Sequence, residues 1–448
     1  MKKILSTFFL TYLRWLAKIQ LLKNQSLVIG ITGTAGKTSA RNAVAAILKN
    51  EYQIKVSYKA NSETGIPLNL LGLTAHDYSL KDWLRLCLLA PIKLLTNWGK
   101  YQIYVVEMAI DSPLPPKNMD YLLKIIQPDI GIFLNAKPMH SLGFDQLLDD
   151  TVQGKDRREQ ITQLIAQEKG KLITQLPQKG LAVLNFDDAN VKKFTKQTRA
   201  EVIGFGHDQS AQVKFTKYQP SLKGTKFTFE FNQEKQAVNF DKYLLPRHYG
   251  QTFAAGIAVG VKLDISFKQC LANLKNNFKL PPGRSSLISA VKQAMILDSS
   301  YNSSAQPTLD SLELLNQVAL KRKLALLGDM RELGQVAKPE HELVALKAAQ
   351  TCDLVVMVGP LTKKYIVPIL EKNNVEHYHC QNTYQAAKIL KEKLEKDDLL
   401  LVKGSQNTLL LEIAVERLMK DKTQVEELLC RRGKYWDQKR AKLKILKK

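Results

Sequence analysis

The sequence predicts an α/β chain with two domains, each built on a mainly parallel sheet covered by helices. Short apolar, β-like runs alternate with helical stretches from residue 27 to about residue 205. This alternation is typical of parallel strands joined by crossover helices. The same alternation starts again after residue 284. At 448 residues the chain is also too long for one ordinary core.

Residues 1–26 form an apolar and basic segment ahead of the first expected strand. Phe8, Trp15 and Ile19 recur at helical spacing, while Arg14 and Lys18 interrupt the apolar run. This pattern favours an amphipathic surface helix over a membrane-spanning one. Two interpretations stay open: residues 1–24 contact a membrane surface peripherally, or they pack on their own domain. A second apolar and basic stretch, residues 83–98, either extends that surface or belongs to the core.

The first domain is expected to begin at a strand of residues 27–32. Further strands are expected at residues 103–107, 130–135 and 181–185, where apolar runs are bounded by turn residues. Residues 212–240 contain two β-like runs around Gly224 and predict an antiparallel excursion. Residues 249–263, rich in alanine and glycine, predict a helix.

The stretch "KLPPGR", residues 279–284, predicts a hinge because two prolines and a glycine separate periodic segments. We therefore expect a central domain at residues 27–282 and a C-terminal domain at residues 283–448. The apolar runs "AMILD", "KLALLGD", "DLVVMVG" and "DLLLVKG" are the expected strands of this second doubly wound domain. The basic tail predicts a solvated terminal helix.

The chain carries 66 Lys and Arg against 42 Asp and Glu, a net charge of +24. Such an excess indicates acidic partners or a general bias of solvated faces. The lysines are dispersed and no RNA-binding or helix-turn-helix signature is present, so no specific nucleic acid is expected. The five cysteines are scattered without a C-x-x-C pair. This argues against a disulfide framework or a structural zinc site and predicts a cytoplasmic protein.

The stretch "GITGTAGKTS", residues 30–39, links an expected strand to an expected helix. A glycine-rich turn of this kind points backbone N–H groups and the positive end of a helix at phosphates. Lys37 would reach the terminal phosphates of a nucleotide, and Thr38 would ligate Mg²⁺. In the common template the first glycine would stand at Ile31, whereas here it stands at Gly30.

Two further residues stand where a metal site could be completed. Glu107 ends the apolar strand "IYVVE", and His140 follows the strand near "DIGIFLNA". The carboxyl ends of parallel strands meet at the ligand crevice of such sheets. A single strand-end glutamate is as often a structural charge, and a single histidine is more often not a ligand. Their joint placement predicts metal ligation.

An ordered set of motifs resembles the Mur ligase family, and within it most closely the MurF type. The motifs include "GITGTAGKTS", "NSETGIPLNLLG", "VVEMAIDSP", "GLAVLNFDD", "PPGR", "YNSSAQPT", "LLGDMRELG" and "LVKGS". The resemblance covers roughly residues 27–420. It implies a P-loop NTPase-like central domain with a parallel sheet and a C-terminal Rossmann-like domain. In this family the loop reads T-G-T-x-G-K-[ST], which accounts for the displaced Gly30.

The resemblance implies ATP and Mg²⁺ as cofactors and assigns roles by matching position. The phosphates would be bound by Gly33, Thr34, Gly36, Lys37, Thr38 and Ser39. Thr38, Glu107 and His140 would ligate metal, with His140 helping to hold a second ion. Lys169 matches a lysine that many Mur ligases carbamylate, with a surface helix lysine as the alternative. Lys37, His140, Lys169 and Asn302 are the residues to which the resemblance assigns the chemistry.

Further positions would contact the nucleotide and the substrates. Gln251, Arg284 and Asp298 match nucleotide-contacting positions, although the family usually has asparagine where Gln251 stands. The positions matched to the substrates are Asn61, Tyr301, Asn302, Ser304, Lys403 and Ser405. The arginine that usually follows the last of these motifs is Gln406 here, which weakens any assignment for the carboxylate of an incoming dipeptide.

The implied activity is ATP-dependent amide formation in peptidoglycan precursor synthesis, through an acyl phosphate that an amine attacks. The implied partners are a muramoyl tripeptide and D-Ala-D-Ala. Alternatives are a Mur-family ligase that joins a different amine and carboxylate, or a non-catalytic ATP-binding protein at a membrane surface. MurF-type members have a UDP-sugar-binding domain before the loop, whereas 26 residues precede the first strand here. We therefore expect either that UDP is bound in a different way or that the substrate is lipid-linked, at the inner face of the membrane.

Overall fold

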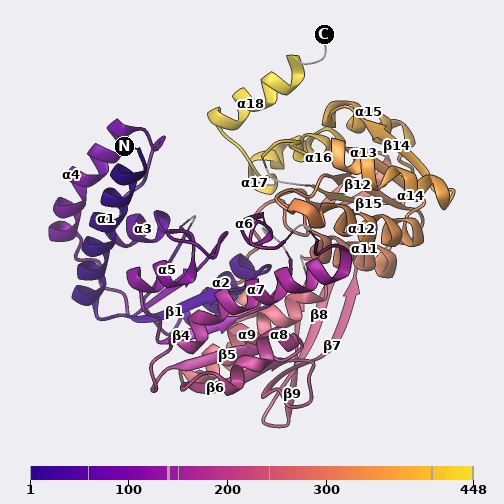
Figure 1. Cartoon of the computed structure of the whole chain (residues 1–448). Helices are drawn as coiled ribbons and strands as arrows, with labels where there is room; N and C mark the ends of the chain where they lie inside the picture. Colours follow the sequence, from indigo (N-terminus) through magenta and orange to yellow (C-terminus); the bar gives the residue numbers. More distant parts are fainter. Residues whose placement is uncertain are drawn as a thin grey trace. The chain divides into compact units, whose positions relative to one another are not determined.

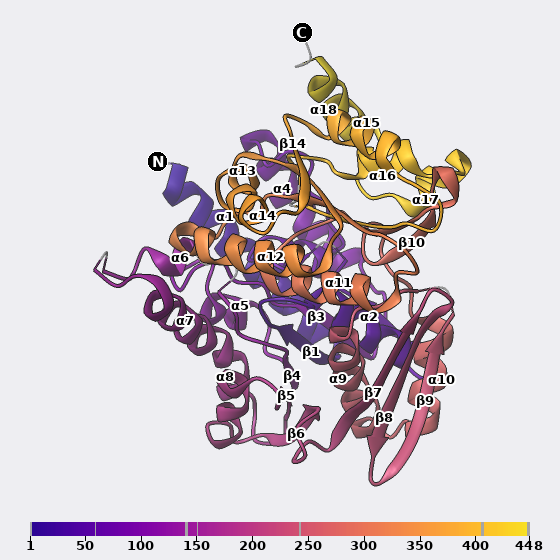
Figure 2. The same cartoon turned by 90° about the vertical axis from the view of Figure 1, so that its right-hand side faces the viewer.

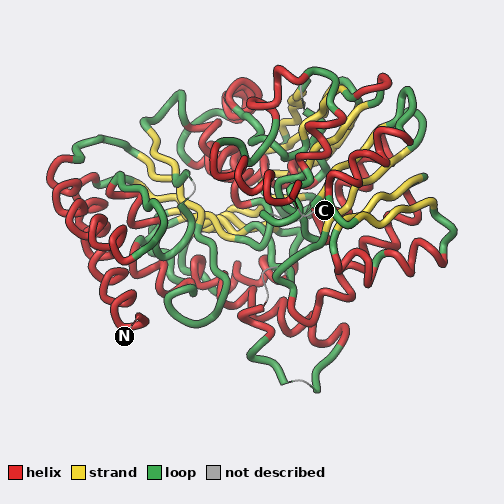
Figure 3. Tube along the Cα trace, turned by 90° about the horizontal axis from the view of Figure 1, so that it is seen from above, coloured by secondary structure: helices red, strands yellow, loops and turns green. Residues whose placement is uncertain are grey.

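The computed structural model describes residues 2–58, 60–138, 142–149, 151–241, 243–404 and 407–445. The chain forms two compact units (Figure 1). The first consists of Met1–Lys217, Thr228–Val238 and Tyr249–Phe278. The second consists of Tyr218–Phe227, Asn239–His248 and Lys279–Lys448. Helices flank the strands of two sheets (Figure 3), which confirms the expected α/β class.

The first sheet has nine strands in the order β2-β3-β1-β4-β5-β6-β7-β8-β9. The pairs from β2 to β7 are parallel. The strands β7, β8 and β9 lie side by side in chain order (Figure 2). The bounds are β1 Leu27–Thr32, β2 Ile54–Val56, β3 Ile103–Glu107, β4 Ile130–Phe133, β5 Leu181–Asn185, β6 Glu201–Gly206, β7 Val213–Ser221, β8 Gly224–Phe231 and β9 Glu234–Phe240.

Helices cover both faces of the parallel part of this sheet. On one face, α9 (His248–Lys262) packs so closely on α2 (Lys37–Leu48) that Gly256 lies against Ile47 and Ala43. On the other face, α7 (Gly154–Thr174) brings Leu172 against β1 and β4. The remaining helices of this unit include α3 Gly65–Leu71, α5 Met119–Ile125, α6 Leu142–Asp145, α8 Ala189–Lys192 and α10 Phe267–Asn277.

The N-terminal helix α1 (Lys2–Asn24) packs on its own unit along one face. It contacts α3 and α4 (Leu80–Thr96), and the three helices share a small apolar core. Leu13, Leu68 and Leu86 belong to this core and are buried. Residues 83–98 therefore contribute one face to a core and leave another face outside it. Among the described residues, no helix is long and apolar enough to cross a membrane.

The second sheet has six strands in the order β10-β11-β15-β12-β13-β14, and only the β10–β11 pair is antiparallel. The strand bounds are β10 Ser286–Ser289, β11 Met295–Ser299, β12 Lys323–Gly328, β13 Leu354–Val358, β14 Glu376–Cys380 and β15 Leu399–Lys403. The main helices are α11 Ala305–Val318, α12 Ala337–Thr351, α13 Pro360–Tyr365, α14 Val367–Lys372, α15 Thr383–Lys393, α16 Glu412–Leu418, α17 Val425–Leu428 and α18 Lys434–Ile445.

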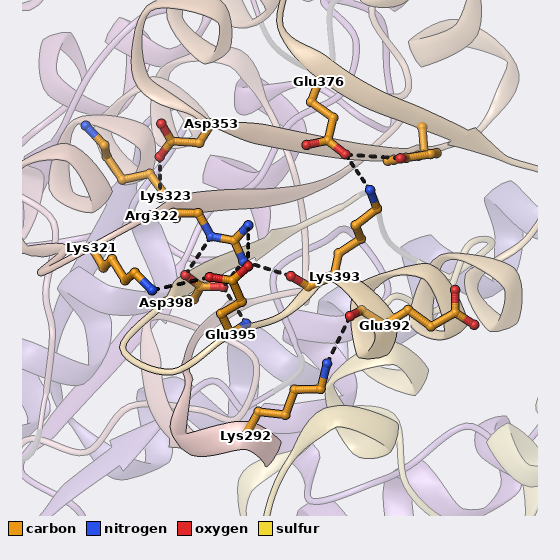
Figure 4. Close-up of polar contacts among 11 residues, drawn as sticks. Lys292, Lys321, Arg322, Lys323, Asp353, Glu376, Glu392, Lys393, Glu395 and Asp398 are labelled. Carbon is orange, nitrogen blue, oxygen red and sulfur yellow. Dashed lines mark hydrogen bonds and ion pairs between the residues drawn. The ribbon is translucent and has the colours of Figure 1, made fainter.

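Ion pairs gather where the strands of the second sheet begin (Figure 4). The Arg322 guanidinium contacts a carboxylate oxygen of Asp398 at 2.6 Å and one of Glu395 at 3.3 Å. Lys393 pairs with Glu376 at 2.8 Å, which links α15 to β14. The Arg322 contacts join the segments that precede the neighbouring strands β12 and β15, and the Lys393 contact lies at the start of β14. The opposite, carboxyl edge is left for the residues of the candidate site.

Candidate functional site

The glycine-rich loop lies between β1 and α2, as the sequence predicts. Gly36, just before α2, has φ of 83°, a left-handed conformation that favours glycine. Gly33 packs so tightly that an added Cβ would lie 2.9 Å from Cβ of Leu134. The Lys37 ammonium donates to the carbonyl oxygens of Gly33 at 2.7 Å and Thr34 at 3.2 Å. The lysine thus closes the loop from inside, next to the positive end of α2, which is the arrangement that binds phosphate.

Asn135 holds this loop in place from the end of β4. Its side-chain oxygen accepts hydrogen bonds from the N–H groups of Thr34 at 3.0 Å and Ala35 at 2.9 Å. Its amide nitrogen donates to the Ala35 carbonyl at 3.1 Å. The Thr34 hydroxyl accepts from the Lys137 N–H at 2.9 Å. The strand ends at Phe133 instead of the expected residue 135, and this frees Asn135 for the loop.

The displaced Gly30 lies within β1 and not in the loop. A Cβ there would lie 2.7 Å from Cγ of Pro128 and 2.9 Å from Sδ of Met108. Both distances are shorter than real Cβ contacts, so a side chain could not be added without displacing neighbours. Gly30 therefore serves the packing of α7 and its neighbours on the sheet, whereas Gly33 and Gly36 shape the loop.

Thr38 and Glu107 meet at the carboxyl ends of β1 and β3. The Thr38 hydroxyl donates to Oε2 of Glu107 at 3.1 Å, and Oε1 of Glu107 lies 2.8 Å from Nη1 of Arg41. Glu107 and Arg41 are both about 5% exposed or less. Arg41 also donates to the Ser57 carbonyl at 2.8 Å, and the Ser57 hydroxyl accepts from the Glu107 N–H at 3.0 Å. The carboxylate is thus held beside the loop threonine by a buried network.

Lys169 is buried near the phosphate loop. It belongs to α7 and is 3% exposed. Burial, and next the nearby Lys37 ammonium, hold the pKa of Lys169 well below its usual range, although Asp111 and Glu168 act in the opposite direction. The surroundings of Lys169 therefore disfavour the charged form of its amine. Because Lys169 is buried, the alternative of a solvated lysine on a surface helix is excluded.

Gln251 lies in the first turn of α9, next to the glycine-rich loop. Its neighbour Thr252 places a hydroxyl 3.7 Å from where a Cβ on Gly36 would lie. The Gln251 side-chain nitrogen donates to Oδ2 of Asp187 at 2.7 Å. The backbone N–H of His207 donates to both carboxylate oxygens of Asp187, Oδ1 at 2.7 Å and Oδ2 at 2.9 Å. The Gln251 amide, which is expected to contact a nucleotide base, is thus oriented by the Asp187 carboxylate.

In the second unit, the hinge and the β11–α11 loop form one cluster. The Arg284 guanidinium lies 4.6 Å from the centre of the Tyr301 ring, and the Tyr301 N–H donates to the Gly283 carbonyl at 3.0 Å. The Lys403 ammonium, at the end of β15, donates to the Asn302 carbonyl. Burial, and next the Arg284 charge, lower the pKa of Lys403 to about 7. Four of the residues matched to nucleotide or substrates therefore lie together.

Asp298 is fully buried at the end of β11, beside this cluster. Its Oδ1 accepts from the Ser300 N–H at 2.9 Å, while Oδ2 has no hydrogen-bond partner among the described residues. Burial raises the pKa of Asp298 to about 6, although Arg431 and Lys403 lower it. Arg431 pairs with the buried Glu412 at 3.0 Å and lies 5.3 Å from the Tyr301 ring centre. Burial raises the pKa of Glu412 to about 6 as well.

Several candidate positions lie elsewhere or outside the described residues. His140 and Ser405 fall outside them, so the second metal ligand and the last substrate position stay predictions. Asn61 is exposed, and its carbonyl accepts from the Ala109 N–H at 2.9 Å, just after β3. Ser304 precedes the first turn of α11. Within the described ranges, no three His, Cys, Asp or Glu side chains gather as a metal site.

Sequence reasoning missed three residues that organise the site: Arg41, Asn135 and Arg431. Arg41 stands three residues after Thr38 on α2, a spacing that places both on one side of a helix. Asn135 lies in the segment after the strand near "DIGIFLNA", where the sequence pointed to His140 alone. Arg431 lies in the basic tail of the sequence, and no local pattern separates it from the solvated cations around it.

The comparisons with known proteins agree with this geometry. Residues 31–260 match the model of the Mur ligase middle domain, and residues 283–406 match that of the Mur ligase glutamate ligase domain. The UDP-N-acetylmuramoyl-tripeptide–D-alanyl-D-alanine ligase of Bacillus subtilis is 25% identical over 411 residues, 90% of this chain and 78% of the relative. The ligase of the same name from Buchnera aphidicola is 24% identical over 405 residues, 89% and 76% of the two chains.

A solved structure with the same fold is the MurF ligase of Thermotoga maritima in complex with ADP. The two chains superpose with a TM-score of 0.72 at 22% identity, over 93% of this chain and 84% of the other. The middle-domain match alone spans more than half of the chain and contains the loop, Glu107 and Lys169. The chain therefore belongs to the Mur ligase family of ATP-dependent acid–amino-acid ligases.

Proposed function

We propose that the protein adds D-Ala-D-Ala to a muramoyl tripeptide in peptidoglycan precursor synthesis. The observation that carries the proposal is the contact of Thr38 with Glu107 beside the closed loop of Lys37. This arrangement suits transfer of a phosphoryl group to a carboxylate. The D-alanyl-D-alanine ligases among the relatives, which align with about nine tenths of the chain, support this choice of substrate.

The donor set of the first unit fits MgATP. Lys37 and the first-turn N–H groups of α2 would hold the β and γ phosphates. The Thr38 hydroxyl and the Glu107 carboxylate are the oxygen ligands that Mg²⁺ prefers, and they already lie within 3.1 Å of each other. A bound Mg²⁺ would neutralise charge on the transferring phosphoryl group. His140 would add a ligand to a second ion. Gln251 would contact the adenine.

Lys169 is proposed to act as a carbamate. A neutral, buried amine can attack CO₂, and loss of a proton leaves a carbamate anion in place of a potential cation. Such an anion would relieve the repulsion between Lys169 and Lys37. It would also offer oxygen atoms to a metal ion. Without the modification, the site holds two lysines and lacks that anionic ligand.

Residues of the second unit are proposed to contact the amine and the nucleotide. Arg284 and Asp298 would contact the nucleotide, and Tyr301, Asn302 and Ser304 would line the approach of the amine. Lys403, with a pKa of about 7, can hold or release a proton near neutral pH. Asn61 would contact the muramoyl substrate from the first unit. The acyl phosphate formed on the tripeptide would be attacked by the free amine, and phosphate would leave as the amide forms.

Phosphate release from ATP tests this proposal. The assay uses UDP-linked and lipid-linked muramoyl peptides, each with D-Ala-D-Ala, with another amine, or with none. We expect release that requires both substrates and falls by at least about a hundredfold in Lys37→Ala and Glu107→Gln. Release with a different amine only would show another member of the family, whereas ATP turnover indifferent to every amine would contradict a ligase. Comparing the UDP-linked with the lipid-linked muramoyl peptide also shows whether the substrate is a cytoplasmic UDP-sugar or is bound to the membrane.

A further inference from the structure

One face of α4 presents a continuous row of exposed apolar side chains. The row consists of Leu80, Leu84, Leu88, Ile92 and Leu95, and Trp98 follows just after the helix; these side chains are 51% to 72% exposed. Their spacing of three and four residues places them on one side of the helix. The other side, with Leu86 and Ala90, packs into the core shared with α1 and α3. A row of this length is more than the scattered single residues of an ordinary surface.

Helix α1 runs alongside α4 in the same direction. The Phe9 ring stacks on the Trp83 ring at 5.6 Å, near the start of both helices. The Tyr12 hydroxyl donates to the Cys87 carbonyl at 3.2 Å one turn later. Near their ends, the Lys23 ammonium donates to the Leu94 carbonyl at 2.9 Å. Because the contacts advance together along both chains, the pair is parallel.

The exposed apolar residues of α1 lie on the same side of this pair. Phe8, Trp15 and Leu22 are 61% to 75% exposed and recur every seven residues. On the helical wheel they lie about 90° from the side of α1 that contacts α4. The α4 row lies about 100° around its helix from the side of α4 that contacts α1. Seen along the two parallel axes, this rotation runs in the opposite direction to the rotation on α1. For parallel neighbours, opposite rotations bring both rows to one side, so the two helices form a single apolar face, the α1/α4 face.

The two helices of the α1/α4 face carry positive charges, apart from one paired acid in α4. Residues 1–50 contain no aspartate or glutamate. The single acid of α4 is Asp82, which is buried and paired with Arg85 at 2.6 Å. Lys18 and Lys81 are exposed beside the rows. At the far end, the Lys23 ammonium lies 3.5 Å from the centre of the exposed Trp98 ring. Leucines, an exposed tryptophan at one end and surrounding lysines are typical of helices that lie in the interface of anionic membranes.

We propose that the α1/α4 face docks on an anionic phospholipid bilayer, with both helices lying in the plane of the interface. The charge of the face complements acidic lipid headgroups, and its apolar rows fit the acyl region beneath them. No described helix can span a membrane, so attachment is peripheral. The main contribution comes from α4 and not from α1, whose apolar side chains are mostly used in the core. This docking does not depend on which substrates the ligase joins.

Vesicle flotation of the full chain tests the proposal without any substrate. The probes are vesicles of phosphatidylcholine containing phosphatidylglycerol and vesicles of phosphatidylcholine alone. We expect binding to the anionic vesicles, weakened at least about tenfold by Leu88→Ser with Leu95→Ser. The matched control changes two exposed leucines of the second unit, Leu320→Ser with Leu346→Ser, and should bind as the parent does. Lys18→Gln with Lys81→Gln should weaken binding to the anionic vesicles only.

Point substitutions are preferred to removal of α1, because removal would uncover Leu68, Leu71 and Leu86. Circular dichroism and thermal unfolding check that each variant is folded. Equal flotation of the parent and the Leu88/Leu95 variant would overturn the proposal, as would failure of the parent to float. Light scattering that shows a dimer, lost in the same variant without vesicle binding, would instead show that this face joins two copies of the chain.

Discussion

At the scale of single residues, Arg41 is the buried cation that holds the Glu107 carboxylate beside the loop. The pair is buried, and Arg41 is its charged partner in the hydrogen-bond network. Replacing Arg41 by Met leaves a buried carboxylate without its cation and should lower the free energy of unfolding by about 3 kcal/mol. Chemical denaturation of the first unit measures this change.

A double variant separates the charge effect from lost packing. Arg41→Met combined with Glu107→Gln removes both charges and should recover at least about 1 kcal/mol of the loss. If the double variant is as unstable as the sum of the two single ones, the ion pair is not the cause. This outcome would contradict the assignment of Arg41 as the partner that holds Glu107.

Asp298 gives the second unit a dependence of stability on pH. Its pKa in the folded chain, about 6, is raised above the ordinary value of 3.8 by burial. The folded state therefore binds the proton more tightly, and stability falls as pH rises from about 4 to about 6. Asp298→Asn removes this fall. Between pH 5 and pH 7.5, the variant should gain about 1 kcal/mol relative to the parent.

Thermal unfolding of both proteins at the two pH values measures that gain. For each protein, the stability at pH 5 is first subtracted from the stability at pH 7.5. Effects of the asparagine that do not depend on pH then cancel. A difference between variant and parent that stays constant from pH 5 to pH 7.5 would show that Asp298 does not titrate in this range. The opposite sign would mean that Arg431 and Lys403 outweigh burial.

The sequence predicts the residues with a chemical function better than the residues that position them. Lys37, Thr38 and Glu107 are predictable because a loop motif and a strand end place them. Asn135 and Arg431 are not, since their roles arise from contacts with segments about a hundred or more residues away. Such contacts leave no periodic trace in a single sequence.

At the scale of elements, Gly30 lets β1 accept the layer that contains α7. A Cβ at this position would come within 2.7 Å of Pro128 and 2.9 Å of Met108. Gly30→Ala should therefore destabilise the first unit by about 1–3 kcal/mol through overpacking. Denaturant unfolding measures the loss. Gly99→Ala, in an exposed loop where a Cβ meets its nearest neighbour at 3.4 Å, is the control and should change little.

The sequence predicts the presence of most strands and long helices well, but it predicts the residues at which they end less accurately. Strands β1, β3 and β5 have the expected bounds, because each is an apolar run flanked by turn residues. Strand β4 is shorter than expected because Asn135 bonds to the loop instead of continuing the ladder. Strands β2, β6, β10 and β14 were not expected, and β2 and β14 show why. Both are short edge or near-edge strands with polar residues, and only the neighbouring strand stabilises them.

At the scale of the whole molecule, the six-stranded sheet and its apolar core lie within the second unit, whereas β1 to β6 of the nine-stranded sheet lie within the first. A core substitution should therefore act within its unit. Leu400→Ala, at a fully buried position of β15, should cost about 2–5 kcal/mol. Hydrogen exchange followed by mass spectrometry should show faster exchange in β11, β12 and β15, with β1, β3 and β4 unchanged.

Leu320→Ala is the control for this experiment, because Leu320 is 76% exposed in the same unit. It should leave exchange unchanged throughout the chain. Equal acceleration in both sheets after Leu400→Ala would show that the units unfold as one. In that case the division into separate domains at the "KLPPGR" hinge would have no energetic meaning.

The sequence by itself determined the α/β class, the phosphate loop and the family. These depend on local order: apolar periodicity sets strands and helices, and the loop motif is contiguous. Only the tertiary structure decided that Gly30 is a packing residue, that Lys169 is buried near Lys37, and that Arg41 holds Glu107. It also decided that α4 offers one apolar side to the core and another to the outside. The physical reason is that burial and charge pairing depend on which distant segments fold together, and one sequence does not record that.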